Sequence, residues 1–185
     1  IFIEEWLSLV KSKSGERGII NRIALQKQAA KYGRRSIDYE YGTNPCAEVI
    51  LRDKQFCNLT EIIVRATDSI SDLRKKVRIA AIIGTFQATL TRFNFLSEKW
   101  KSNTQEEALL GVSMTGIMDN PLTAGLQGKE KLSKVLDELR EYVVEVNKEW
   151  SAILGINPSA ATTSVKPSGT ISQLCDTASG IHARH

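Results

Sequence analysis

Apolar side chains recur at helical spacing along much of the chain. The helical pattern covers residues 2–13, 23–35, 69–96 and 129–154. In the last of these segments, one stripe consists of Leu132, Val135, Leu139, Val143, Val146 and Trp150. Such a stripe predicts a helix face that packs against a core. We expect Ser69 or Ser71 to cap the third helix and a position near Gly33 to end the second.

Shorter runs of strand-forming residues lie between the expected helices. They cover residues 18–22, 56–64, 109–121 and 162–166, and a turn is expected over 14–18. Strands that alternate with long helices predict an α/β architecture with parallel pairing. The length fits one domain or a piece of a larger one. Because no methionine opens the chain and a motif nearly closes it, we expect a fragment of a longer protein.

Charge and cysteine content narrow the classes of partner. The 25 Lys and Arg residues exceed the 21 Asp and Glu residues, 25 − 21 = +4, and they are scattered along the chain. Scattered charge favours a site for small anions over a nucleic-acid surface. No apolar run reaches the roughly 18 residues of a membrane span and no signal peptide pattern is present, so a cytoplasmic protein is expected. Three cysteines do not form a disulfide framework and indicate reactive or buried thiols.

The segment TNPCAEVILRDKQFCNL gathers unusual chemistry in a short stretch. In an extended chain, alternate side chains share a face, so Asn44, Cys46 and Glu48 would point into one small volume. Pro45 favours the extended form because it biases the preceding residue away from helix. Its missing N–H group suits a loop or a sheet edge. The pattern therefore predicts a thiol, a carboxylate and a carboxamide side by side.

Several chemistries are compatible with this segment. A nucleophilic cysteine usually needs a histidine base, and His182 and His185 at the end of the chain are the only histidines. A tetrahedral metal site usually has its cysteines two to four residues apart, a spacing that is absent here. Alternatively, Cys46 and Cys57 are small buried hydrophobic residues and Glu48 lies on a solvated loop. The residues alone leave these readings open.

A second motif, KPSGT, runs from Lys166 to Thr170 between a short strand and an expected helix. Gly169 permits a turn whose N–H groups point outward, and Ser168 and Thr170 add hydroxyl donors. The motif is compatible with a phosphate-binding loop. Taken alone, such a motif is more commonly an ordinary turn followed by a Ser or Thr helix cap.

Taken together, the motifs resemble those of the catalytic subunit of ribonucleotide reductase. The matching segments are SKSGERGIINR, NPCAEV, FCNL, LLGVSMTGI, and SVKPSGTISQL followed by SGIH. They occur in the order of that family and cover nearly the whole chain. The resemblance implies that residues 1–185 form part of a ten-stranded α/β barrel, with a central finger loop at about residues 43–50.

The resemblance also implies roles for the residues of the finger loop. Cys46 would carry the thiyl radical that removes the 3′ hydrogen of the ribose, and Glu48 would be the base on the 3′ hydroxyl. Asn44 would hydrogen-bond the substrate hydroxyls. After the 2′ hydroxyl leaves as water, a cysteine pair that includes Cys57 would supply the reduction.

The phosphate loop, at about residues 166–171, would hold the phosphates of the substrate. The residues implied are Pro167, Ser168, Gly169 and Thr170. The family's second reducing cysteine lies on an earlier strand, and no cysteine precedes Cys46 here. We therefore expect that partner outside this chain, and we expect Cys175 to be a packed thiol.

The motif wording is most similar to the adenosylcobalamin-dependent class, class II, and especially to its monomeric branch, which acts on ribonucleoside triphosphates. In that branch, homolysis of the cobalt–carbon bond yields a radical that oxidises Cys46. The implied partners are a thioredoxin-like reductant and nucleotide effectors that bind outside this chain, with no nucleic acid and no membrane. The alternatives are a class I large subunit acting on diphosphates and a noncatalytic nucleotide-binding fragment.

Overall fold

The structure is a computed structural model that describes residues 1–14 and 18–184, arranged in two compact units. The first unit, Ile1–Glu40, contains α1 (Phe2–Ser12) and α2 (Arg22–Ala30). The expected strand over 18–22 is wrong, because Asn21 instead caps α2 by accepting a 3.1 Å hydrogen bond from the Ala24 N–H. Most of the turn expected over 14–18 lies outside the described residues.

The second unit, Tyr41–His185, is built on parallel strands. β3 (Asn58–Ile63) pairs with β4 (Leu110–Thr115) in parallel, with Thr60 opposite Val112. A single parallel bridge joins Val112 to Thr163 on the other edge of β4. The strand predicted over 162–166 is therefore reduced to this contact, and β4 lies between two neighbours.

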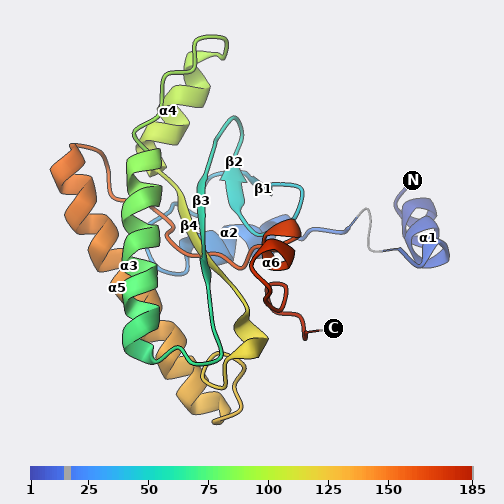
Figure 1. The fold of residues 1–185 in the computed structure, drawn as a ribbon. Helices are drawn as coiled ribbons and strands as arrows, with labels where there is room; N and C mark the ends of the chain where they lie inside the picture. Colours follow the sequence, from blue (N-terminus) through green and yellow to red (C-terminus); the bar gives the residue numbers. More distant parts are fainter. Residues whose placement is uncertain (15–17, 185) are drawn as a thin grey trace. The chain divides into compact units, whose positions relative to one another are not determined.

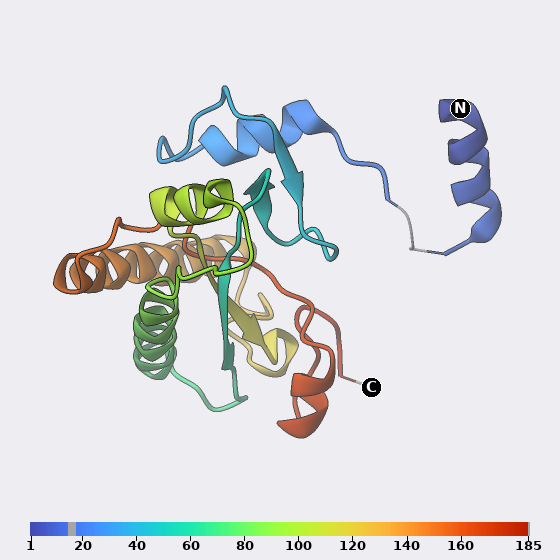
Figure 2. The same ribbon diagram turned by 90° about the horizontal axis from the view of Figure 1, so that it is seen from above.

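Two long helices cover one side of these strands (Figures 1 and 2). They are α3 (Ile70–Gln87) and α5 (Lys129–Leu154), and α3 packs against β3, β4 and α5. The core is apolar: Ile62, Val64, Leu73, Val77, Ala80, Ala81, Leu110, Val112, Val135, Leu139, Val143 and Val146. Four residues of the predicted α5 stripe belong to this core, which confirms that face.

Buried polar groups join the end of α5 to its surroundings. The Asn147 side chain is 2% exposed and donates hydrogen bonds of 2.9 Å to Thr85 Oγ1 and to Ser159 Oγ. Its Oδ1 accepts a 2.8 Å bond from the Ser159 N–H. Because unpaired buried polar groups are costly, these bonds fix the chain that leaves α5 against α3.

The helix predicted over 69–96 begins as expected but ends earlier. Ser69 caps α3 as predicted, with a capping box formed with Asp72. The helix stops at Gln87, where the Thr89 hydroxyl donates a 2.7 Å hydrogen bond to the Phe86 carbonyl. A separate helix, α4 (Glu98–Glu107), follows, which the apolar pattern does not predict.

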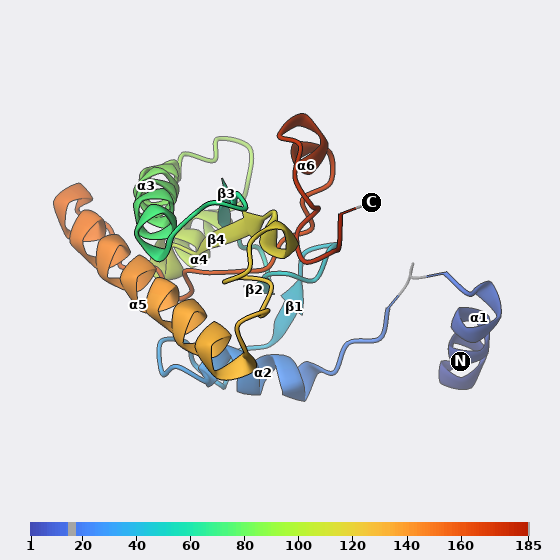
Figure 3. The same ribbon diagram turned by 60° about the horizontal axis from the view of Figure 1, so that its bottom comes forward.

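The remaining elements are short. A hairpin of β1 (Tyr41–Thr43) and β2 (Ile50–Arg52) precedes β3, a 3-10 turn (Ile117–Asp119) follows β4, and α6 (Thr170–Leu174) lies near the end of the chain. The views in Figures 1 and 3 place α6 on the side of the strands away from α3 and α5. The mixed helix and strand architecture with parallel pairing is thus confirmed. Among the described residues, no helix has the length and apolarity needed to cross a bilayer.

Candidate functional site

The loop of the β1–β2 hairpin carries the first candidate residues. It is closed by hydrogen bonds from the Asn44 N–H to the Val49 carbonyl (3.3 Å) and from the Ala47 N–H to the Asn44 carbonyl (2.9 Å). Asn44 Oδ1 also accepts a 3.1 Å bond from the Val49 N–H. The loop is therefore a tight turn organised by Asn44.

The expectation of an extended segment with alternating side chains is wrong. Ala47 has a φ of 60°, in the left-handed region, so the chain reverses between Cys46 and Glu48. Cys46 is exposed near the tip of the loop, whereas the Glu48 side chain is only 1% exposed. The turn thus presents the thiol outward and the carboxylate inward.

The Glu48 carboxylate is paired with a residue of the second motif. Its Oε1 lies 3.1 Å from Nζ of Lys166, which is 118 residues further along the chain. Burial raises the pKa of Glu48, but hydrogen bonds from its own backbone, Asn44 and Lys166, together with the lysine charge, outweigh burial and lower the pKa. Glu48 Oε2 is buried and, within the described chain, accepts no hydrogen bond. One oxygen is therefore paired with Lys166, and the other is buried with no hydrogen-bond partner of standard geometry among the described residues.

Cys57 belongs to the same electrostatic environment. It is half-buried just before β3, and it is a free thiol like Cys46. Burial and the negative charge of Glu48 raise the pKa of Cys57, and the charge of Lys166 and a backbone hydrogen bond lower it by less. A thiol with a raised pKa stays protonated near neutral pH, which suits a donor of hydrogen rather than a nucleophile.

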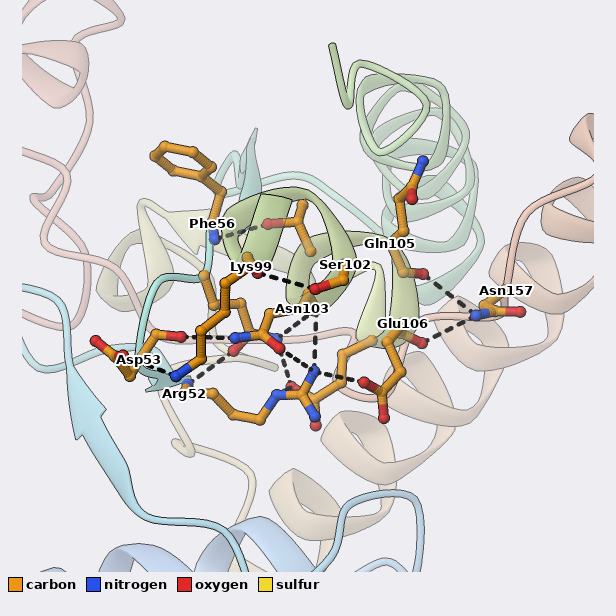
Figure 4. Close-up of polar contacts among 12 residues, drawn as sticks. Arg52, Asp53, Phe56, Lys99, Ser102, Asn103, Gln105, Glu106 and Asn157 are labelled. Atoms are coloured by element: carbon orange, nitrogen blue, oxygen red, sulfur yellow. Dashed lines mark hydrogen bonds and ion pairs between the residues drawn. The ribbon is translucent and has the colours of Figure 1, made fainter. Parts of the chain in front are cut away.

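A polar network around α4 fixes the backbone that leads to Cys57 (Figure 4). Arg52 donates a 2.9 Å hydrogen bond to Glu106, and Asn103 donates a 2.7 Å bond to the Asp53 carbonyl. The Phe56 N–H donates to the Thr104 hydroxyl at 3.2 Å. These contacts hold the connection between β2 and β3 against α4.

The second motif forms a loop at the carboxyl end of the strand-like segment beside β4. The Lys166 N–H donates a 2.9 Å hydrogen bond to Oγ of Ser113, a buried residue of β4. Gly169 has a φ of 54°, and the buried Ser168 hydroxyl interacts with Glu61 but makes no hydrogen bond of standard geometry among the described residues. The loop therefore has a polar group and a turn suited to a ligand, while Thr170 begins α6.

Glu61 on β3 is a site residue that the sequence reading missed. Both of its carboxylate oxygens are buried and accept no hydrogen bond within the described part of the chain. Burial raises its pKa more than the Ser168 hydroxyl and the Lys166 charge lower it. The sequence does contain a signal for this residue, because Glu61 is a single charged side chain within the strand-forming run NLTEIIV.

Two other chemistries find no support in the geometry. No hydrogen bond joins the His182 side chain to Cys46 or Cys57 in the described chain, and His185 lies outside it. Residues 1–14 and 18–184 contain no cluster of three or more His, Cys, Asp or Glu residues that could hold a metal ion. Cys175 is a half-buried free thiol at the end of α6.

Comparisons with known proteins extend this picture. No protein-family model matches the chain. It is 30% identical over 199 residues to the adenosylcobalamin-dependent ribonucleoside-triphosphate reductase of Lactobacillus helveticus (strain DPC 4571), covering 91% of this chain and 26% of that protein. The enzyme of the same name from Lactobacillus leichmannii is 29% identical over 203 residues, covering 92% and 26%. The chain thus spans about a quarter of the length of the curated relatives that it matches.

A solved structure agrees with these relatives. A crystal structure of a B12-dependent, class II ribonucleotide reductase superposes with a TM-score of 0.65 and 28% identity, covering 78% of this chain and 23% of the other. The resemblance to the ribonucleotide reductases, which the motifs predicted, is therefore confirmed. More particularly, the relatives are adenosylcobalamin-dependent ribonucleoside-triphosphate reductases, the branch that the motif wording indicated.

Proposed function

We propose that this chain forms the reaction centre of a reductase that converts ribonucleoside triphosphates to 2′-deoxyribonucleotides by radical chemistry. The observation that carries the proposal is the meeting of the two motifs through the 3.1 Å contact between Glu48 and Lys166. It brings a loop with an exposed thiol next to a loop suited to phosphate. The names of the relatives support the same substrate class.

The proposed chemistry assigns one task to each side chain. Cys46, as a thiyl radical, takes the 3′ hydrogen of the ribose, and Glu48 accepts the proton of the 3′ hydroxyl through its unpaired Oε2. Asn44, which shapes the turn, directs its amide toward the same hydroxyls. Positioning of this kind requires a preorganised loop, because a thiyl radical must approach one C–H bond closely.

The reduction is completed by thiols. The 2′ hydroxyl leaves as water, and Cys57 and a second cysteine supply two electrons and two protons as they become a disulfide. Cys46 then returns the hydrogen to C3′ and is a thiyl radical again. The other described cysteines are Cys46, which starts the reaction, and Cys175 at the end of α6, so we assign the second reducing cysteine to another part of the longer protein. A thioredoxin-like protein then reduces the disulfide by thiol exchange.

Substrate phosphates are held by the second loop. We assign this role to the hydroxyls and backbone N–H groups of the segment formed by Pro167, Ser168, Gly169 and Thr170. The buried Ser168 hydroxyl, which makes no hydrogen bond in the described chain, supports the assignment because a phosphate oxygen would satisfy it.

Adenosylcobalamin fits the accessible position of Cys46, whose exposed thiol can be reached from outside the loop. When bound, this cofactor supplies a carbon-centred radical by homolysis of its cobalt–carbon bond. The residues of this chain contribute the placement of Cys46 and the shielding of Glu48 from water. We further propose that the parallel strands are part of a ten-stranded barrel around the loop, and that nucleotide effectors bind elsewhere in the longer protein.

The test is an assay of the full-length gene product with ribonucleoside triphosphates, with ribonucleoside diphosphates, and with or without adenosylcobalamin. We expect turnover of triphosphates that requires the cofactor. Cys46→Ser should abolish turnover and retain nucleotide binding, whereas Cys175→Ser should retain both. Absence of cofactor-dependent turnover in a folded wild-type protein would overturn the proposal. Turnover of diphosphates that needs a second, radical-bearing subunit instead of adenosylcobalamin would indicate the class I alternative.

A further inference from the structure

Lys166 occupies the junction between the two loops of the site. Its backbone N–H is anchored to Ser113 of β4 at 2.9 Å, and its ammonium lies 3.1 Å from Glu48. The next residue, Pro167, begins the proposed phosphate-binding segment. A single residue therefore contacts the sheet, the hairpin loop and the phosphate loop.

The charge of Lys166 compensates a carboxylate that water cannot reach. The Glu48 side chain is 1% exposed and that of Lys166 is 33% exposed, so the pair is shielded mainly on the carboxylate side. A buried carboxylate without a counter-charge takes up a proton instead of remaining ionised. The hydrogen bond to Glu48 in turn raises the pKa of Lys166, which keeps the ammonium charged.

The other charged and titratable groups that face Lys166 are also acidic. They are Glu61 on β3, Cys46 on the hairpin loop and Cys57 before β3. Within the described chain, the electrostatic causes that act on these groups include no second cation beside Glu48. Within the described chain, Lys166 is therefore the cation that supports the ionised form of Glu48, beside the hydrogen bonds from the Glu48 backbone and Asn44.

We propose that Lys166 is a positioning residue of the reaction, which keeps Glu48 ionised as a base and ties the loop of Cys46 to the loop that binds the substrate phosphates. This inference rests on the proposed function. Lys166 acts through Glu48 and need not touch the reacting atoms. Because of this contact, Glu48 and the phosphate loop move as one unit. The distance between the ribose and the Cys46 thiol is then the same each time a substrate binds.

The experiment uses the full-length protein with Lys166→Met, Lys166→Arg and the control Lys101→Met. Lys101 forms an ion pair of similar length with Glu98, 3.2 Å, but on the exposed surface of α4. We expect Lys166→Met to lower kcat between about ten- and a hundredfold, with a smaller change in KM. The acidic limb of its kcat/KM profile should move to higher pH, because the loss of the lysine charge raises the pKa of Glu48. In Lys166→Arg the acidic limb of the profile should return to the wild-type pH. In Lys101→Met both kcat and the pH profile should equal those of the wild type.

Lys166→Gln keeps the test decisive if Lys166→Met folds poorly, because it retains a hydrogen-bond donor and removes only the charge, and its acidic limb should also move to higher pH. A second comparison tests whether Lys166 acts through Glu48. Glu48→Gln and the double variant Glu48→Gln/Lys166→Met leave no ionised Glu48, so removal of the lysine should lower kcat no further. A further tenfold loss in the double variant, or an unmoved pH limb in Lys166→Met, would overturn the inference. An inactive wild-type protein would instead count against the proposed function, which separates the two failures.

Discussion

The buried Arg52 provides a direct test of how the approach to Cys57 is held. Its side chain is 5% exposed and its Nη2 contacts Glu106 Oε2 at 2.9 Å and Asn103 at 3.3 Å. Its Nε lies 3.7 Å from Oε2 of Glu107, which is 6% exposed. Arg52→Met removes the charge opposite the buried Glu107 and keeps most of the apolar stem.

The magnitude follows from the burial of each partner. Removing one member of a buried ion pair costs about 3–5 kcal/mol, because it leaves an uncompensated charge. Glu106 is 57% exposed, so its contact with Arg52 adds no more than about 1 kcal/mol. Glu107 retains a 2.5 Å hydrogen bond from Gln55 Nε2, which favours the lower end of the range of about 3–5 kcal/mol. We therefore expect a loss of about 3 kcal/mol in local stability.

Amide hydrogen exchange measures this loss at the backbone itself. The Phe56 N–H is bonded to the Thr104 hydroxyl, and the Asn58 N–H is bonded to the Leu109 carbonyl at 2.9 Å. Exchange at both amides reports opening of the segment that holds Cys57. A loss of about 3 kcal/mol corresponds to exchange about a hundredfold faster in Arg52→Met.

Two variants control for charge loss alone. Lys99→Met breaks a 3.1 Å pair with Asp53 that is exposed on both sides, and it should change exchange by less than about fivefold. Arg52→Met/Glu107→Leu removes both buried charges and should recover most of the protection. The reasoning is refuted if Arg52→Met exchanges like Lys99→Met, or if the double variant is no better protected than the single one.

Three further predictions concern stability. A Cβ at Gly84 would lie 2.1 Å from Leu110 Cδ1, so Gly84→Ala should displace the buried Leu110 side chain and lower the free energy of unfolding by about 1–3 kcal/mol; an unchanged Tm would contradict this packing. Asn147→Ala removes three buried hydrogen bonds and should cost about 2–4 kcal/mol in urea unfolding, whereas a cost below about 1 kcal/mol would mean that water replaces them. The bond from Arg184 holds the pKa of Asp119 below its ordinary 3.8, so its stabilisation is present above that pH and lost as the pH falls through the folded value. The Tm difference between wild type and Asp119→Asn should accordingly shrink in acid.

The sequence predicts those parts of the fold that depend on local patterns. The stripe that includes Val135 and Leu139 identifies the buried face of α5, and Ser69 identifies the start of α3. These signals survive because helix periodicity and capping involve residues only three or four positions apart. The strand formers around Leu110 likewise predict β4.

The elements that the sequence does not predict depend on distant partners. In α4, the residues buried against the rest of the unit are Thr104 and Glu107, which have polar side chains and so produce no apolar stripe. The pairing of Glu48 with Lys166 joins positions 118 residues apart, which no local pattern records. The motifs identify the candidate residues, but side-chain alternation predicts the wrong position for Glu48, because the chain turns at Ala47 and is not extended.

Ala47 carries an implication for how tolerant the hairpin loop is to change. A left-handed conformation costs an alanine roughly 1 kcal/mol, a cost that glycine would avoid. Glycine would, however, open many more backbone states directly beside Cys46. Ala47 thus restricts the number of backbone conformations at the tip of the loop. The loop is slightly less stable as a result, but its conformation is better defined. Substitutions at position 47 should therefore change how closely the position of the Cys46 thiol is defined more than they change the stability of the fold.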